Sequence, residues 1–221
     1  MWKYTFQWRQ VWQHLPDMLW GALVTLEIAA LAMILGTIIG VLLALAKRSN
    51  NVILVSISNV WVEIARNAPA LFQIYMVYFG LGSFGLRIDS FLALLIGITF
   101  NNAGYLAETF RGGFKAVPET QMRAARSLGM GPGQAMWHVM LPQMFRVVFY
   151  ALTNQMVWSI LMTSLGVVVG LTTDLTGVTQ QLNVRTFRTF EYFFAAAVLY
   201  LLIAKVFTLS ARLLAARLFR Y

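Results

Sequence analysis

The chain has 221 residues, of which 59% are hydrophobic and 11% are charged. Soluble domains are nearer half apolar and a quarter charged, so the composition indicates an integral membrane protein and argues against a soluble enzyme or a disordered chain. The net charge of +9 fits basic cytoplasmic segments that face anionic lipid, and we expect no nucleic-acid partner. With no cysteine and no histidine at metal-ligand spacing, we expect neither a metal site nor a cofactor.

Hydrophobic segments long enough to cross a membrane recur along the chain, since a spanning helix needs about 20 mostly apolar residues. We predict an all-α membrane protein that forms a single transmembrane domain over residues 1–221. Its five transmembrane helices are expected at residues 19–46, 52–81, 90–110, 144–171 and 193–214. The second helix should break at the sequence Arg66-Asn67-Ala68-Pro69, because proline disfavours helical backbone in the preceding residue and lacks an amide hydrogen.

The distribution of lysine and arginine selects the orientation, because cytoplasmic segments carry the excess of these residues. With residues 1–18 as a periplasmic segment, ten basic residues fall on the cytoplasmic side: Lys47, Arg48, Arg111, Lys115, Arg123, Arg126, Arg146, Arg212, Arg217 and Arg220. Five fall outside: Lys3, Arg9, Arg87, Arg185 and Arg188. We therefore expect the N-terminus outside and the C-terminus inside.

Residues 111–142, between the third and fourth predicted helices, are expected to form a short helical hairpin on the cytoplasmic face. Pro118 suits the first turn of a helix, and Gly129 suits a left-handed C-terminal cap. A turn then leads to a second short helix that should end at Leu141-Pro142. Composition alone is equally consistent with a solvated basic loop.

The hairpin resembles the EAA loop of the inner-membrane permease subunits of ATP-binding-cassette importers. Ala124-Ala125, Gly129 and the ending Val139-Met140-Leu141-Pro142 match, whereas Arg123 replaces the acidic residue of the pattern. Further motifs resemble those of polar-amino-acid permeases: Arg66-Asn67-Ala68-Pro69, Tyr105-Leu106-Ala107-Glu108-Thr109-Phe110-Arg111-Gly112-Gly113, Leu128-Gly129-Met130, Leu141-Pro142-Gln143 and Thr163-Ser164-Leu165. Leu161 and Met162 stand where that family usually has Lys and Asp or Asn.

This resemblance implies the type I permease fold of a polar-amino-acid importer of the histidine, glutamine, glutamate or arginine type, in the bacterial inner membrane. The chain would be a permease subunit and not itself an enzyme. The implied partners are a second permease subunit, two ATPase subunits and a periplasmic solute-binding protein. The two departures from the motifs favour a related, non-identical second permease. The ATPase-coupling residues would be Arg123, Ala124, Ala125, Arg126, Ser127, Leu128 and Gly129.

Polar side chains at membrane depth define a candidate substrate pathway, because such groups in lipid usually face protein or water. The candidates are Arg66, Asn67, Asn101, Asn102, Gln155, Ser159, Thr163 and Ser164. Helix–helix packing is the alternative role for the asparagines and for the stripe in the fourth helix. Arg66 either offers two donors to an amino-acid carboxylate or bonds the carbonyls freed at the break. The fourth helix carries no acidic residue, which favours a neutral or acidic substrate or a pocket supplied by a non-identical partner permease.

Glu108 and Arg111 should form a structural ion pair that anchors the hairpin, with gating as the alternative. Glu27 should be interfacial or paired with a partner subunit. The polar segment 166–191 is either a solvated loop or the surface that receives the solute-binding protein. An ion-coupled secondary transporter and an assembly scaffold without a pathway remain the alternative functions.

Overall fold

The computed structural model describes residues 4–219, and every regular element in that range is helical, which confirms the predicted all-α class. In chain order the helices are α1 (Trp8–Gln13), α2 (Leu15–Ala46), α3 (Val52–Asn67), α4 (Ala70–Tyr75), α5 (Leu81–Ser83), α6 (Ser90–Ala116), α7 (Glu119–Ser127), α8 (Pro132–Ala135), α9 (Leu141–Met162), α10 (Leu175–Thr186) and α11 (Thr189–Leu218). Lys3 and Arg220, which entered the charge count, lie outside the described residues.

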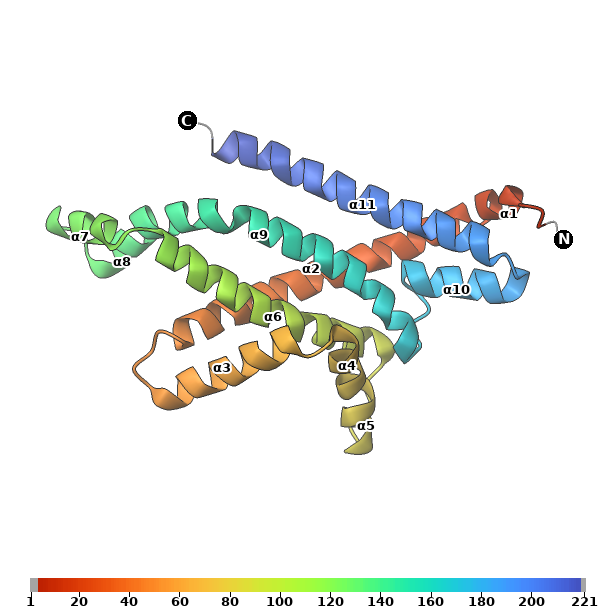
Figure 1. Ribbon diagram of the computed structural model, residues 1–221, viewed down its shortest axis with the longest axis horizontal. Coiled ribbons are helices and arrows are strands. Elements are labelled where there is room, and N and C mark those ends of the chain that lie inside the picture. Colours follow the sequence, from red (N-terminus) through yellow and green to blue (C-terminus); the bar gives the residue numbers. More distant parts are fainter. Residues whose placement is uncertain (1–3, 220–221) are drawn as a thin grey trace.

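Four helical runs are long and apolar enough to cross a membrane: Leu15–Ala46, Ser90–Ala116, Pro132–Val169 and Thr189–Leu218. In Figure 1 these runs lie along the long axis of the molecule, and α11 stands at one side of the bundle. The α7–α8 hairpin and the end of α11 lie at one end, whereas α1 and α10 lie at the other. The two ends of the described chain therefore lie toward opposite ends of the long axis.

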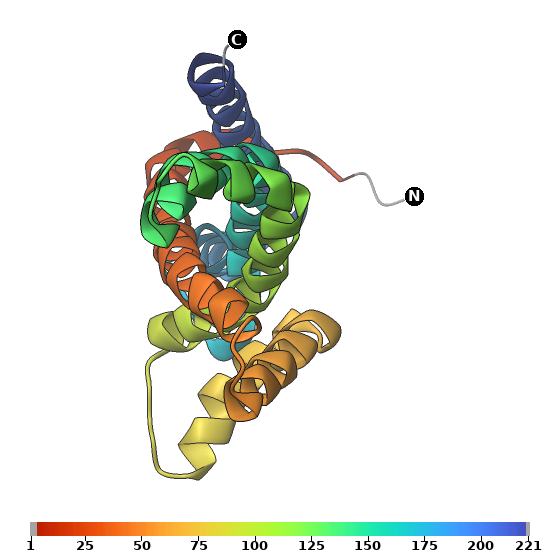
Figure 2. The same cartoon turned by 90° about the vertical axis from the view of Figure 1, so that its left-hand side faces the viewer.

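The second predicted helix is divided at the predicted place. α3 ends at Asn67, Ala68 is extended with φ −91° and ψ 140°, and α4 begins after Pro69. The apolar run Ala70–Ser83 then leaves the bundle at a steep angle to α3 (Figures 1 and 2). This span therefore consists of two pieces, with the joint held against α6.

The fourth span differs from the prediction because its helix does not stop at Leu141-Pro142. A π-helical turn over Met136–Met140 joins α8 to α9, and Pro142 lies in the first turn of α9. The widened turn accommodates the proline, and the Gln143 side-chain amide donates to the Val139 carbonyl at 2.9 Å. The helix thus runs without a break from the hairpin to Val169.

The hairpin turn has the predicted left-handed cap. Gly129 has φ +86°, the Gly129 amide donates to the Arg126 carbonyl at 3.1 Å, and the Met130 amide donates to the Ala125 carbonyl at 3.2 Å. These two bonds define a Schellman motif, in which glycine avoids the strain that a Cβ would bring. Pro118 precedes the first residue of α7 and does not belong to its first turn.

The contact between α2 and α6 depends on small residues. A Cβ added to Gly36 would lie 2.6 Å from Asn102 Cβ, and one added to Gly40 would lie 2.9 Å from Leu106 Cβ. The spacing Gly36-x-x-x-Gly40 puts both glycines on one face of α2, where they allow the backbones to approach closely. α6 is thereby placed at the centre of the bundle, between α2 and α9 and against α3 and α4.

We expect Gly36→Leu to destabilise the protein by about 1–3 kcal/mol, because the larger side chain must push α6 away from α2. Gly112→Leu is the matched control, since a Cβ there meets nothing within 4 Å and leucine is the better helix former. Thermal unfolding of the purified protein, followed by tryptophan fluorescence, measures both. Equal midpoints for the two variants would contradict the close α2–α6 contact.

Candidate functional site

The break between α3 and α4 is held by two side-chain amides. Gln73 Nε2 donates to the carbonyls of Ala65 at 3.0 Å and Ala68 at 2.9 Å. Asn101 Nδ2, from α6, donates to the Ala65 carbonyl at 2.9 Å and to Gln73 Oε1 at 3.1 Å. Both amides are buried, and they satisfy the carbonyls that the missing helical turn leaves open.

Arg66 does not hold the break. Its side chain is exposed, and its guanidinium lies over the Tyr105 ring at 5.7 Å from the ring centre. The carbonyls of Ala65 and Ala68 are bonded by Gln73 and Asn101 instead, and that of Arg66 accepts from Tyr105 Oη at 3.4 Å. Of the two roles considered for Arg66, the structural one therefore falls to other residues.

The predicted polar stripe of α9 meets α6 at Asn102. Gln155 Nε2 and Ser159 Oγ both donate to Asn102 Oδ1, at 2.8 Å and 3.0 Å. Asn102 and Ser159 are fully buried, while Gln155 is half-buried. These bonds tie the two central helices together at membrane depth, which is the packing role that short polar side chains have in lipid.

Thr163 and Ser164, at the C-terminal end of the polar stripe, donate hydrogen bonds to backbone carbonyls of their own helical run. Thr163 is buried, and its hydroxyl donates to the Ile160 carbonyl at 2.8 Å. Ser164 likewise donates to the Leu161 carbonyl at 2.7 Å. Thr163 also faces Tyr200 of α11, whose hydroxyl lies 2.9 Å from that of Thr176. Among the pathway candidates, Arg66 and Asn67 remain exposed in the single chain.

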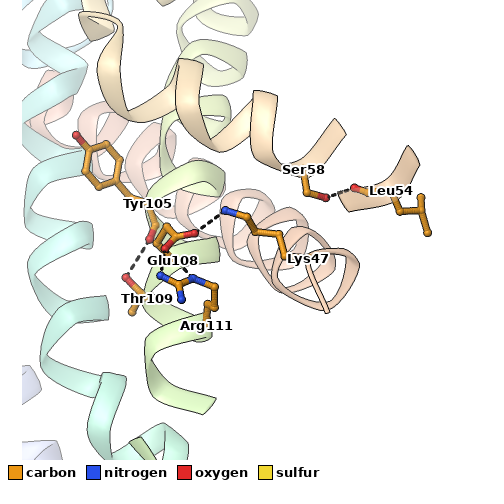
Figure 3. A network of polar contacts seen from close by, with 7 residues as sticks. All are labelled: Lys47, Leu54, Ser58, Tyr105, Glu108, Thr109 and Arg111. Carbon is orange, nitrogen blue, oxygen red and sulfur yellow. Dashed lines mark hydrogen bonds and ion pairs between the residues drawn. The ribbon is translucent and has the colours of Figure 1, made fainter. Parts of the chain in front are cut away.

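Glu108 forms the predicted ion pair with Arg111 and a second ion pair with Lys47. Arg111 Nε and Nη2 lie 2.8 Å and 2.5 Å from Glu108 Oε2, and Lys47 Nζ lies 2.6 Å from Glu108 Oε1 (Figure 3). The Lys47 and Glu108 side chains are only 15% and 17% exposed. Because Lys47 follows the last residue of α2, this network fixes the end of α2 to α6, next to the hairpin.

The two alanines of the hairpin face in different directions. Ala125 is 4% exposed and packs inside the hairpin, where α7 meets α8 and the π turn, whereas Ala124 is exposed. Arg123, which replaces the acidic residue of the motif, forms a solvent-exposed ion pair with Glu119 at 3.0 Å. Leu128, at the tip, is 81% exposed. The surface available to a partner thus carries Ala124 but not Ala125.

At the opposite end, segment 166–191 is ordered by Asp174, which caps α10. Asp174 accepts hydrogen bonds from the amides of Thr176 and Gly177, and burial raises the pKa of its carboxyl to about 6. Arg188 donates to the Thr5 carbonyl at 3.2 Å and lies over the Tyr4 ring, while Arg185 is exposed. Only Arg185 of these two arginines is thus available to a partner in this part of the chain.

Glu27 is exposed on an otherwise apolar face of α2, between Leu23 and Leu31. Within residues 4–219 no group of three histidine, aspartate or glutamate side chains is placed to hold a metal ion.

Sequence reasoning missed Gln73 and Lys47. The signal for Gln73 was a polar residue in an apolar segment four residues after Pro69. Lys47 was counted only toward the orientation of the chain, although a lysine at the end of a span next to a carboxylate on the next long helix is a candidate for pairing.

Comparisons with known proteins identify the family of the chain. Residues 36–220 match the model of the family described as "Binding-protein-dependent transport system inner membrane component". The glutamine transport system permease protein GlnP of Escherichia coli (strain K12) is 33% identical over 96% of this chain and 98% of its own length. The arginine transport system permease protein ArtQ of Bacillus subtilis (strain 168) is 30% identical over 88% of this chain and 89% of its own.

Solved structures show the same fold. A chain from the crystal structure of an amino acid ABC transporter with histidines superposes with a TM-score of 0.90 at 30% identity, covering 97% of this chain and 100% of its own. A chain of the MetNI methionine ABC transporter, in an inward-facing conformation, superposes with a TM-score of 0.72 over 96% of this chain and 99% of its own. At 18% identity, this second likeness concerns the fold alone.

We expect Gln73→Met to destabilise the protein by about 1–3 kcal/mol, because it leaves the partly buried carbonyl of Ala68 without its donor and removes one of the two donors to the carbonyl of Ala65. Arg66→Gln should change stability much less, since it removes only an exposed contact with Tyr105 worth about 0.5–1 kcal/mol. Thermal unfolding of both variants measures the difference. A larger loss for Arg66→Gln would show that the arginine supports the break after all.

Lys47 and Glu108 should be energetically coupled. A double-mutant cycle of Lys47→Met and Glu108→Gln is expected to give a coupling energy of about 1–2 kcal/mol, because both groups are largely shielded from water. The exposed pair Arg123–Glu119 is the internal control, with an expected coupling of about 0.3–0.5 kcal/mol. Denaturant unfolding measures both cycles, and equal couplings would mean that the Lys47 contact is worth no more than an exposed ion pair.

Proposed function

Because the chain belongs to the family of binding-protein-dependent transport system inner membrane components, we propose that it carries a polar amino acid across the bacterial inner membrane. A periplasmic solute-binding protein delivers the substrate, and ATP hydrolysis on two separate ATPase subunits drives the import. A second permease subunit, related or identical, completes the membrane part. The orientation is N-terminus outside and C-terminus inside, so residues 1–18 are periplasmic and residues 111–142 are cytoplasmic.

The observation that carries this proposal is the α7–α8 hairpin at one end of the bundle. It lies directly between α6 and α9, the two helices that Asn102, Gln155 and Ser159 join at membrane depth. A partner that moves the hairpin therefore moves both central helices. Such a transfer of motion to a packed pair of membrane halves is what an importer driven by a separate motor requires.

The test is uptake by proteoliposomes that contain the permease, its ATPase and its solute-binding protein. Labelled L-glutamine, L-glutamate, L-histidine and L-arginine are supplied with internal ATP, with ADP, or with an ion gradient alone. We expect uptake of at least one of them with ATP only. Uptake driven by the gradient alone would identify a secondary transporter, and assembly without uptake would identify a scaffold.

The exposed hairpin residue gives a sharper prediction for docking. Ala124→Trp should weaken association with the ATPase by about tenfold or more and abolish ATP-driven uptake, because the indole occupies the surface that the ATPase contacts. Ala124→Ser keeps the side chain small and should behave as the wild type. Copurification with the ATPase and uptake measure both effects.

Ala125→Trp separates docking from folding of the hairpin. Since Ala125 is buried, this variant should lower the thermal stability of the permease itself. Unchanged copurification and uptake with Ala124→Trp would rule out this surface as the ATPase contact.

A further inference from the structure

The exposed surface of α3 is divided into an apolar and a polar stripe. Helical spacing puts Ile53, Ile57, Val60 and Ile64 on one stripe and Ser56, Asn59, Glu63 and Asn67 on the other, with Arg66 at its edge, and all of these side chains are exposed. The apolar stripe suits lipid. The polar stripe carries a carboxylate and a guanidinium near the break of a membrane helix, so it must face water or protein.

Glu63 and Arg66 are opposite charges one helical turn apart, yet they do not pair. Elsewhere in the chain such neighbours do pair: Glu108 with Arg111 at the same spacing, and Glu119 with Arg123 at the next. Among residues 4–219 no ion pair joins Glu63 to Arg66, although both side chains lie on the same side of α3. The separation of these two charges is therefore explained by their contacts with other residues and not by their spacing along the helix.

Each charge is held by a different neighbour. Glu63 Oε1 accepts a hydrogen bond of 2.7 Å from Asn67 Nδ2, which fixes the carboxylate toward the end of α3. The Arg66 guanidinium lies over the Tyr105 ring, and Tyr105 Oη in turn faces the Arg66 carbonyl at 3.4 Å. Glu63 Oε2 and the guanidinium N–H groups remain without a partner among the described residues.

We propose that Glu63 and Arg66 form a binding subsite for the α-amino and α-carboxylate groups common to all α-amino acids. The Arg66 guanidinium receives the α-carboxylate as a two-donor fork, and Glu63 Oε2 accepts from the α-ammonium. A zwitterion matches this surface because its two charges can bind the two opposite charges of Glu63 and Arg66, which are not paired with each other. Tyr105 and Asn67 are positioning residues, which hold the two charges in place.

This inference rests on the proposed function and deepens it. The subsite binds only the α-amino and α-carboxylate groups, which all α-amino acids share. Selectivity among amino acids must therefore come from residues outside the subsite. Since the two charges belong to neighbouring turns of one helix, the subsite needs no residue from a partner subunit to be complete.

The test pairs each variant with a substrate analogue that lacks the matching charge. Binding is measured on the assembled transporter in lipid nanodiscs, without the solute-binding protein, by scintillation proximity. The probes are L-glutamine, L-glutamate, L-histidine and L-arginine, together with the N-acetyl form of each, which lacks the ammonium, and the α-carboxamide form, which lacks the carboxylate.

We expect Glu63→Gln to weaken binding of the free amino acid by about tenfold or more and to leave binding of the N-acetyl form at the wild-type level. Arg66→Gln should show the mirror pattern, with a loss for the free amino acid and none for the α-carboxamide form. Arg66→Lys should restore part of the affinity, because it keeps the charge but loses the fork. Ile64→Val, on the apolar stripe of the same turn, is the control and should bind all probes as the wild type does.

Two results would overturn the subsite. Equal losses for all three forms of a probe would indicate a structural effect, and wild-type binding in both variants would show that neither charge meets the ligand. ATP-driven uptake that continues unchanged in Glu63→Gln and Arg66→Gln would remove the subsite but leave the proposed function intact. Absence of ATP-driven uptake in the wild type would instead remove the proposed function.

Discussion

A helix that stops inside a membrane exposes carbonyl oxygens where no water can bond them, and the centre of this structure is arranged around that constraint. At the α3–α4 joint the carbonyls of Ala65 and Ala68 are bonded by the amides of Gln73 and Asn101. Gln73 comes from the segment after the break and Asn101 from the middle of α6. The joint is therefore built into the bundle, and α6 must stay in register with it.

α6 meets its other neighbours with equally specific contacts. On one side Gly36 and Gly40 let α2 approach its backbone, and on another Asn102 accepts hydrogen bonds from Gln155 and Ser159 of α9. Glu108 then ties the end of α6 next to the hairpin to Lys47. Without a hydrophobic driving force between helices in lipid, such close backbone contacts and buried polar bonds are what determine the packing.

The elements that depend on local rules were predictable from the sequence. Apolar length indicated the spans, Pro69 indicated the break, and Gly129 indicated the left-handed cap of α7. The contacts that depend on which helices meet were not predictable. Nothing in the sequence around Gln73 shows that its amide turns back to Ala65, and helical spacing leaves open which of Ala124 and Ala125 faces outward. Pro142 misled for a related reason, because a proline stops a regular helix but not one that has already widened into a π turn.

The unbroken helix from Pro132 to Val169 has a mechanical consequence. A hairpin connected through a flexible linker could swivel while the membrane part stayed at rest, but here the second arm of the hairpin and the far end of the fourth span belong to one continuous helical run, with a π turn at Met136–Met140 and a 3-10 segment at Thr163–Val169. A tilt applied at α8 is therefore transmitted along α9 to the far end of the span. The hydrogen bonds to Asn102, which hold α9 against α6 at membrane depth, set the point about which the run can tilt. The compliance of the molecule must lie outside this run, and the α3–α4 joint does not supply it freely, because bending at Ala68 would break the hydrogen bonds that Gln73 and Asn101 make there.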